Sequence, residues 1–188
     1  MRAREACSTA VMTAACLATN YALVGVPNVK LMDLLVFASG FLFGTKVGVS
    51  VAVLTWLIYG TLNPYGFCLP ILVATATSET IYGLAGGLLR SSKGPSWLEE
   101  DGLAWSSYKL AVLGFSLTAA YDLLTNLAFS LTFGVPFLLA LAYGAWFAVL
   151  HEASNAALFA ACTPALLRVS RLLGQSPGEW EVSRSGSQ

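Results

Sequence analysis

The chain has 188 residues, of which 56% are hydrophobic and only 11% are charged, and its mean hydropathy is +0.70. Soluble domains carry about 25% charged residues, so this composition indicates an integral membrane protein. Ten Lys and Arg residues balance ten Asp and Glu residues and occur in short groups between apolar segments. This pattern lacks the basic patch of a nucleic-acid-binding protein.

Apolar segments near the length that crosses a bilayer, about 20 residues, follow one another along the chain. Four of them predict helices near 7–26, 69–90, 107–133 and 136–166. The N-terminal residues 1–27 contain two arginines, an apolar run and small residues, as a secretory signal does, but Glu5 and the lack of a clean cleavage site favour a retained helix.

The apolar stretch 29–63 is too long for one spanning helix and short for two. Glycines and Lys46 lie near its middle, where a tight turn is easiest. We therefore predict two helices there, 31–44 and 47–62. The expected fold is an all-α membrane bundle of six transmembrane helices over 1–174, followed by a disordered cytoplasmic tail over 175–188.

Basic residues predict the orientation, because cytoplasmic loops carry an excess of Lys and Arg. With six spans, one side receives nine of the ten basic residues and the other receives only Lys30. We expect N- and C-termini in the cytoplasm and a multi-pass protein of the cell membrane. The outer loops, 26–30, 63–70 and 133–137, are short and contain Pro or Gly, so they suit tight turns that cap a pocket.

Ionisable residues lie within the predicted spans, where each costs about 2.5–3.5 kcal/mol at a helix centre, so each is a candidate for function. These residues are Glu79, Asp122, His151 and Glu152, with Asp33 just inside an outer end. Asn126 lies one helical turn after Asp122 on the same face. One alternative is that Glu79, Asp122 and His151 satisfy each other as a buried structural network.

Other site chemistries find little support. The four cysteines have neither C-x-x-C spacing nor a His-rich neighbourhood, so no metal site or disulfide framework is predicted. Hydrolase and phosphate-loop motifs are missing from the sequence. We therefore expect no enzyme activity and no cofactor, and keep an intramembrane hydrolase or transferase using Asp122, His151 and Glu79 as the alternative.

Small residues recur every four positions in the first helix, at Ala6, Ala10, Ala14 and Ala18. Such a stripe lets another helix approach closely within a membrane. It suits packing within the chain, docking to a partner, or a protein whose whole function is assembly.

Several segments in order resemble a known family. They are "VPNV", the glycine-spaced "GFLFGTKVGVSVAVLTWLIYGTLNPYG", "YDLLTNLAF" and "HEASNAALFA". Together with the alanine stripe, they resemble the substrate-binding S components of energy-coupling factor (ECF) vitamin transporters, over roughly residues 8–168.

The resemblance implies a six-helix protein that captures a vitamin-like micronutrient in an outward-facing pocket. Such a protein docks through the alanine stripe onto a membrane scaffold (T) subunit with two cytoplasmic ATPases, and it delivers its ligand without an ATPase motif of its own. The implied substrate-binding residues are Glu79, Asp122, Asn126, Tyr143, Trp146, His151, Asn63, Tyr65 and Cys68. On this hypothesis a polar ligand, rather than another side chain, satisfies Asp122.

Acidic residues outnumber basic ones in this predicted pocket, since Asp33, Glu79 and Asp122 face only Lys30 and His151. Carboxylates favour a cationic or multiply hydroxylated ligand. A thiamin-like cation or a modified nucleobase therefore fits better than a dicarboxylate such as folate. Cys68 leaves a corrinoid open, because a thiol binds soft metals.

Overall fold

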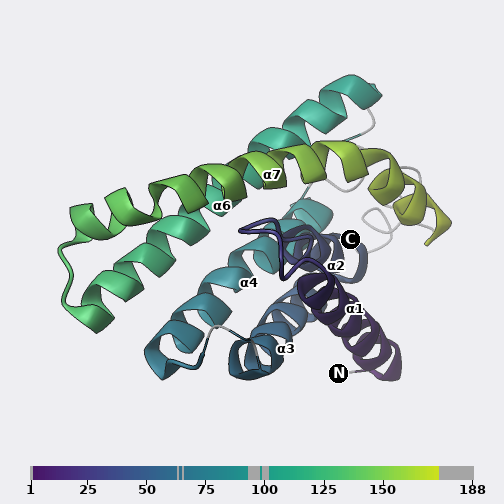
Figure 1. The fold of residues 1–188 in the computed structure, drawn as a ribbon. Helices are drawn as coiled ribbons and strands as arrows, with labels where there is room; N and C mark the ends of the chain where they lie inside the picture. The colour runs from purple at the N-terminus through teal and green to yellow at the C-terminus, as the bar shows by residue number, and fades with distance from the viewer. Residues whose placement is uncertain (1, 63, 65, 93–97, 99–101, 174–188) are drawn as a thin grey trace.

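The structure, a computed structural model, describes residues 2–62, 64, 66–92, 98 and 102–173. Over these residues the chain forms six α-helices (Figure 1): α1 (Ala3–Ala22), α2 (Met32–Phe43), α3 (Thr45–Leu62), α4 (Leu69–Ser92), α6 (Leu103–Phe133) and α7 (Phe137–Leu172). No strand occurs in this part of the chain. The predicted all-α fold is confirmed for the described residues, while the predicted tail over 175–188 lies outside them.

A single glycine divides the long apolar stretch into two helices, as predicted. Gly44 separates α2 from α3 and has a φ of +99°, a conformation that residues with a Cβ rarely adopt. Its N–H still bonds to the Gly40 carbonyl, so α2 is closed before the chain reverses. The turn is possible because position 44 has no side chain.

Helix α2 lies at the centre of the molecule. Ten of its twelve residues are buried, and it packs against α1, α3, α4 and α7. Its sequence, MDLLVFASGFLF, is apolar on nearly every face, which is typical of a helix surrounded by other helices. Asp33 in its first turn is thereby drawn into the protein interior.

Glycines allow α2, α3 and α4 to cross in near backbone contact. A Cβ built on Gly83 would lie 2.5 Å from the carbonyl carbon of Gly48, and one on Gly40 would lie 2.2 Å from the Gly83 oxygen. Gly86 approaches Phe37 of α2 as closely. The glycines of "YGLAGGLL" therefore pack inside the protein, and these contacts fix the three helices as one unit.

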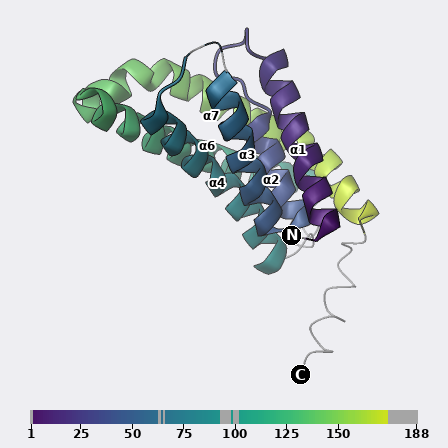
Figure 2. The ribbon, with the colours of Figure 1, turned by 90° about the horizontal axis from the view of Figure 1, so that it is seen from below.

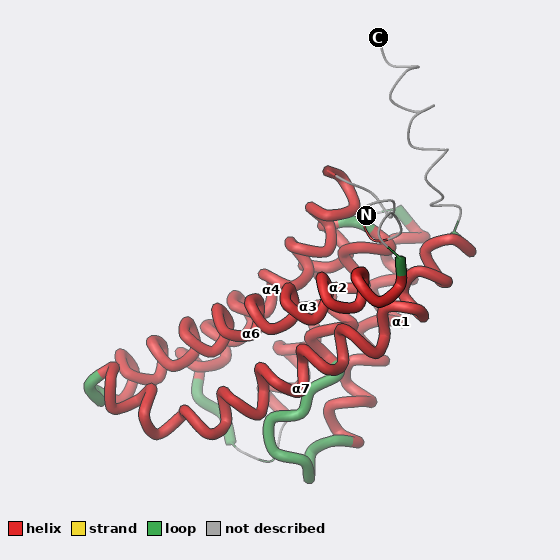
Figure 3. The backbone as a smooth tube through the Cα atoms, turned by 90° about the horizontal axis from the view of Figure 1, so that it is seen from above, coloured by secondary structure: helices red, strands yellow, loops and turns green. Residues whose placement is uncertain are grey.

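Helices α6 and α7 form a long antiparallel pair, and their shared turn extends away from the other four helices (Figures 1 and 3). They contain 31 and 36 residues, about 46 and 54 Å at 1.5 Å per residue. Gly134, with a left-handed φ of +66°, ends α6. Along the other half of the pair, α6 packs on α4 and α7 packs on α2.

Three helices, α3, α6 and α7, are long and apolar enough to cross a membrane, and α2 is apolar but shorter. Large apolar side chains also cover much of the surface, among them Leu131 and Leu138 at 76% and 80% exposure. An apolar surface of this extent suits lipid rather than water. These features support a membrane protein.

The start of α1 and the end of α7 lie at the same end of the molecule (Figure 2). The connections 23–31, 66–68 and 134–136 lie toward the other end, which we call the loop end.

Candidate functional site

Five buried polar side chains from three helices form a hydrogen-bonded group, which we call the histidine cluster. Its members are Asp33 of α2, Thr118 and Asp122 of α6, and His151 and Asn155 of α7. None is more than 9% exposed. Burial at this level is tolerated because each residue has at least one protein partner.

His151 stands between two carboxylates. Its Nδ1 lies 3.0 Å from Asp122 Oδ1, and its Nε2 lies 2.7 Å from Asp33 Oδ2. A carboxylate oxygen only accepts hydrogen bonds, so each contact needs one proton. An imidazolium with two carboxylates meets this need, as does a neutral imidazole with one protonated Asp. Either arrangement gives the three residues a net charge of −1.

Asn155 ties the cluster together one turn along α7. Its Nδ2 donates to Asp33 Oδ2 at 2.6 Å and to Thr118 Oγ1 at 2.8 Å. The Tyr82 hydroxyl of α4 donates to the same Thr118 oxygen at 3.0 Å. The cluster thus connects α2, α6 and α7 to α4 across the interior.

Glu79 has a different partner. Its Oε2 accepts a hydrogen bond of 3.2 Å from the Trp56 indole N–H of α3, and the residue is fully buried. The structural network considered from sequence is therefore confirmed for Asp122 and His151, whereas Glu79 bonds to Trp56. The expectation that a ligand satisfies Asp122 is wrong for its Oδ1, which His151 satisfies.

Three buried oxygens in this region have no hydrogen-bond partner among the described residues: Glu79 Oε1, Asp122 Oδ2 and Asn155 Oδ1. Leaving a buried acceptor unpaired costs about 1–3 kcal/mol. The region therefore retains acceptor capacity for a proton, a water molecule or a donor group.

Lys30 lies on the loop-end side of these acids. Its ammonium is 5.2 Å from the centre of the Trp56 ring and 5.5 Å from that of Tyr121. It interacts electrostatically with Asp33 and Glu79, yet among the described residues no carboxylate lies within ion-pair distance of it. Aromatic faces and more distant acids hold this cation in place.

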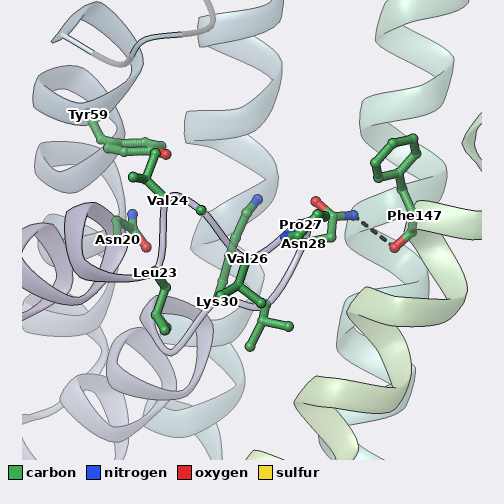
Figure 4. Close-up of a pocket in the computed structure, with 11 residues that line it drawn as sticks. Asn20, Leu23, Val24, Val26, Pro27, Asn28, Lys30, Tyr59 and Phe147 are labelled. Atoms are coloured by element: carbon green, nitrogen blue, oxygen red, sulfur yellow. Dashed lines mark hydrogen bonds between the residues drawn. The ribbon is translucent and has the colours of Figure 1, made fainter.

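Two pockets adjoin at the loop end, and both are lined by Asn28, Lys30 and Tyr59. The first, the loop pocket, has a volume of about 460 Å³ and lies beneath residues 23–30 (Figure 4). There Asn28 Nδ2 donates to the Phe147 carbonyl of α7 at 2.8 Å, which ties the loop across to that helix.

The second, the aromatic pocket, has a volume of about 520 Å³ and lies between α3, α4 and α6. Rings from α3 and α6 line it, together with a few polar side chains. The lining includes Lys30, Trp56, Tyr59, Thr75, Phe129 and Phe133. Its size falls in the range of small-molecule sites, about 300–1,000 Å³. Glu79 follows Thr75 by one turn of α4 and so lies just beneath this pocket.

The remaining predicted substrate-binding residues lie in different places, and only one of those that the structure describes lines the aromatic pocket. Cys68 lines the aromatic pocket. Asn126 donates to the Asp122 carbonyl at 2.8 Å, and its side chain packs where Gly144 of α7 leaves room. Tyr143 and Trp146 are 71% and 68% exposed and line neither pocket. Asn63 and Tyr65 lie outside the described residues.

The alanine stripe faces outward. Ala6, Ala10, Ala14 and Ala18 are all exposed, whereas α1 packs against the protein through Thr9, Thr13, Cys16 and Asn20. The stripe therefore does not serve packing within the described part of the chain, and it remains available to a partner helix.

Asp33 and Lys30 were expected at the pocket only as charged groups, and neither was among the predicted substrate-binding residues; Asn155 and Thr118 were not predicted as site residues. An available signal was the spacing of Asn155 four residues after His151, which puts both on one helical face. For Asp33 the signal was the uniformly apolar sequence that follows it, since such a helix is central and carries its first turn inward. Thr118 gave no signal, because it resembles any other threonine of an apolar helix.

Comparison with protein-family models, with curated proteins and with solved structures found no match for this chain. The function is therefore inferred from the site itself.

Proposed function

We propose that this protein is the substrate-binding S component of an ECF-type transporter. It spans the cell membrane six times with both termini in the cytoplasm, and it captures a vitamin-like micronutrient from outside. Delivery proceeds through a membrane scaffold subunit driven by two separate ATPases.

The observation that carries this proposal is the aromatic pocket. It has the volume of a small-molecule site, and it lies at the loop end between helices of both halves of the chain. Lys30, Trp56 and the orphan oxygen of Glu79 lie within or next to it. Polar groups set in an apolar cavity are the general arrangement of a binding site.

The exposed alanine stripe gives a second line of support. A smooth helical surface on the outside of a membrane bundle suits close packing by another helix. Because α1 buries its opposite face in the protein, docking at the stripe would leave the pocket intact.

Ligand binding is tested on the purified full chain in detergent micelles. A screen of water-soluble vitamins and their precursors is expected to raise the melting temperature with one compound or a related group, since a ligand that binds only the folded form stabilises it. A screen in which no compound raises the melting temperature would contradict the proposal.

Scaffold docking is tested by substitutions within the stripe. Ala10→Leu or Ala14→Leu is expected to abolish co-purification with the scaffold subunit and to leave ligand affinity unchanged, because both positions are exposed. Ala120→Leu, an exposed alanine of α6, is the matched control and should co-purify normally. Normal co-purification of the α1 variants would place the docking surface elsewhere.

A further inference from the structure

We propose that the aromatic pocket selects a flat aromatic ligand that carries a carboxylate or similar anionic group, and that Lys30 pairs with that group. This inference rests on the proposed binding function and names its substrate class. It differs from the cationic or hydroxylated ligand that the count of acidic residues favours.

The charge at the surface of the aromatic pocket is positive. Thirteen described residues line the aromatic pocket, and Lys30 is the one among them with a charged side chain. The two residues of the 63–70 loop that the structure does not describe, Asn63 and Tyr65, are uncharged. A ligand in this pocket thus meets a positive charge.

The buried acids near the pocket already have partners within the protein. Asp33 and Asp122 share His151, Glu79 accepts the Trp56 N–H, and none of these acids lines either pocket at the loop end. Their charges act on a ligand only from behind Lys30 and Trp56. They hold the ammonium near the pocket without forming an ion pair with it, so its hydrogen-bond donors remain available to a ligand anion.

Aromatic rings from α3 and α6 line the same pocket. Trp56 and Tyr59 are only 9% exposed and form the inner side of the pocket, whereas Phe129 and Phe133 are 41% and 54% exposed and face it from α6. Aromatic side chains from two helices that face one cavity favour a planar guest, because offset-stacked and edge-to-face contacts add to simple burial. Thr75 of α4 adds a hydroxyl to the lining of the pocket.

Three probes of related shape test the proposal on the wild-type protein. These are 1-naphthylacetate, its uncharged amide 1-naphthylacetamide, and the saturated anion cyclohexylacetate. We expect the aromatic acid to bind about tenfold or more tightly than the amide, because a charge-assisted hydrogen bond is lost in the amide. We expect it also to bind more tightly than the saturated acid. Equal affinity of acid and amide would overturn the charge assignment, and equal affinity of the two acids would overturn the aromatic one.

Variants then assign the effect to Lys30. Lys30→Gln should remove the preference for acid over amide, and Lys30→Arg should retain it. Lys46→Gln, which alters an exposed lysine at the opposite end of α3, is the matched control. A Lys30→Gln protein that folds and still prefers the acid would overturn the proposal. If this variant does not fold, the comparison of acid and amide on the wild type still decides.

Failure of this inference is distinguishable from failure of the proposed function. Stabilisation by a cationic or neutral vitamin, with no binding of the aromatic acid, would refute the ligand class and leave the binding function in place. Absence of any stabilisation by the probes and by the vitamin screen would refute both.

Discussion

Replacing His151 with leucine removes the centre of the histidine cluster while keeping a side chain of moderate size. Asp122 then loses the partner of Oδ1, and its Oδ2 has none already. Asp33 keeps the 2.6 Å hydrogen bond from Asn155. The variant therefore leaves the carboxyl group of Asp122, a residue that is 9% exposed, without a hydrogen bond from another described side chain.

The expected loss of stability follows from this stranded carboxyl group. Removing one partner of a buried ion pair lowers the free energy of unfolding by about 3–5 kcal/mol. Removing Asp122 as well, in the double variant Asp122→Leu/His151→Leu, eliminates the stranded carboxyl group. Its loss should be smaller than the sum of the two single losses by about 1–3 kcal/mol, because residues in contact do not act independently.

The assay is reversible unfolding in mixed micelles of dodecyl maltoside and increasing sodium dodecyl sulfate, followed by circular dichroism. Glu152→Gln is the control, since this neighbouring acid is only partly buried and forms no hydrogen bond through its side chain within the described structure. It should change stability by less than about 0.5 kcal/mol. A His151→Leu protein as stable as the wild type, or a double variant with strictly additive loss, would refute the reasoning.

Three other substitutions probe the rest of the fold. Gly83→Ala should lower the free energy of unfolding by about 1–3 kcal/mol through overpacking, because its Cβ would lie 2.5 Å from the carbonyl carbon of Gly48. Gly25→Ala is the control and should leave stability unchanged, because position 25 has open space around it. Equal effects of the two substitutions in the same micelle assay would contradict the close crossing of α3 and α4. Trp56→Phe should cost about 1–3 kcal/mol by leaving Glu79 without its donor, and adding Glu79→Gln should recover part of that loss; no recovery would show that the indole acts through packing alone. Asn28→Ala should speed amide hydrogen exchange in residues 24–30, because it removes the bond to Phe147 and places an alanine at a φ of +51°, whereas unchanged exchange would show that the loop is held by other contacts.

The sequence determined the class of protein and most of the helix boundaries. Apolar segments separated by Gly, Pro and charged residues predicted helix ends within four residues of the observed ones, including the division near residue 44, except that α7 continues six residues beyond its predicted end. These features are local: helix length depends on where apolar residues begin and end, and a reversal within one residue requires glycine. A local period of four residues also put the four alanines on one face of α1, whereas the exposure of that face came from the structure.

Tertiary structure decided which buried polar groups meet. Sequence placed Glu79, Asp122 and His151 within predicted spans but did not say which faces of α4, α6 and α7 meet. Asp33 reached His151 because glycine contacts pull α2 into the centre, and Glu79 was left to Trp56 of α3. The partner of a buried polar group depends on the rotation and crossing of helices over a few ångströms, which no local sequence pattern encodes. In the folded protein the acids bond to other side chains, while Lys30 remains at the pocket.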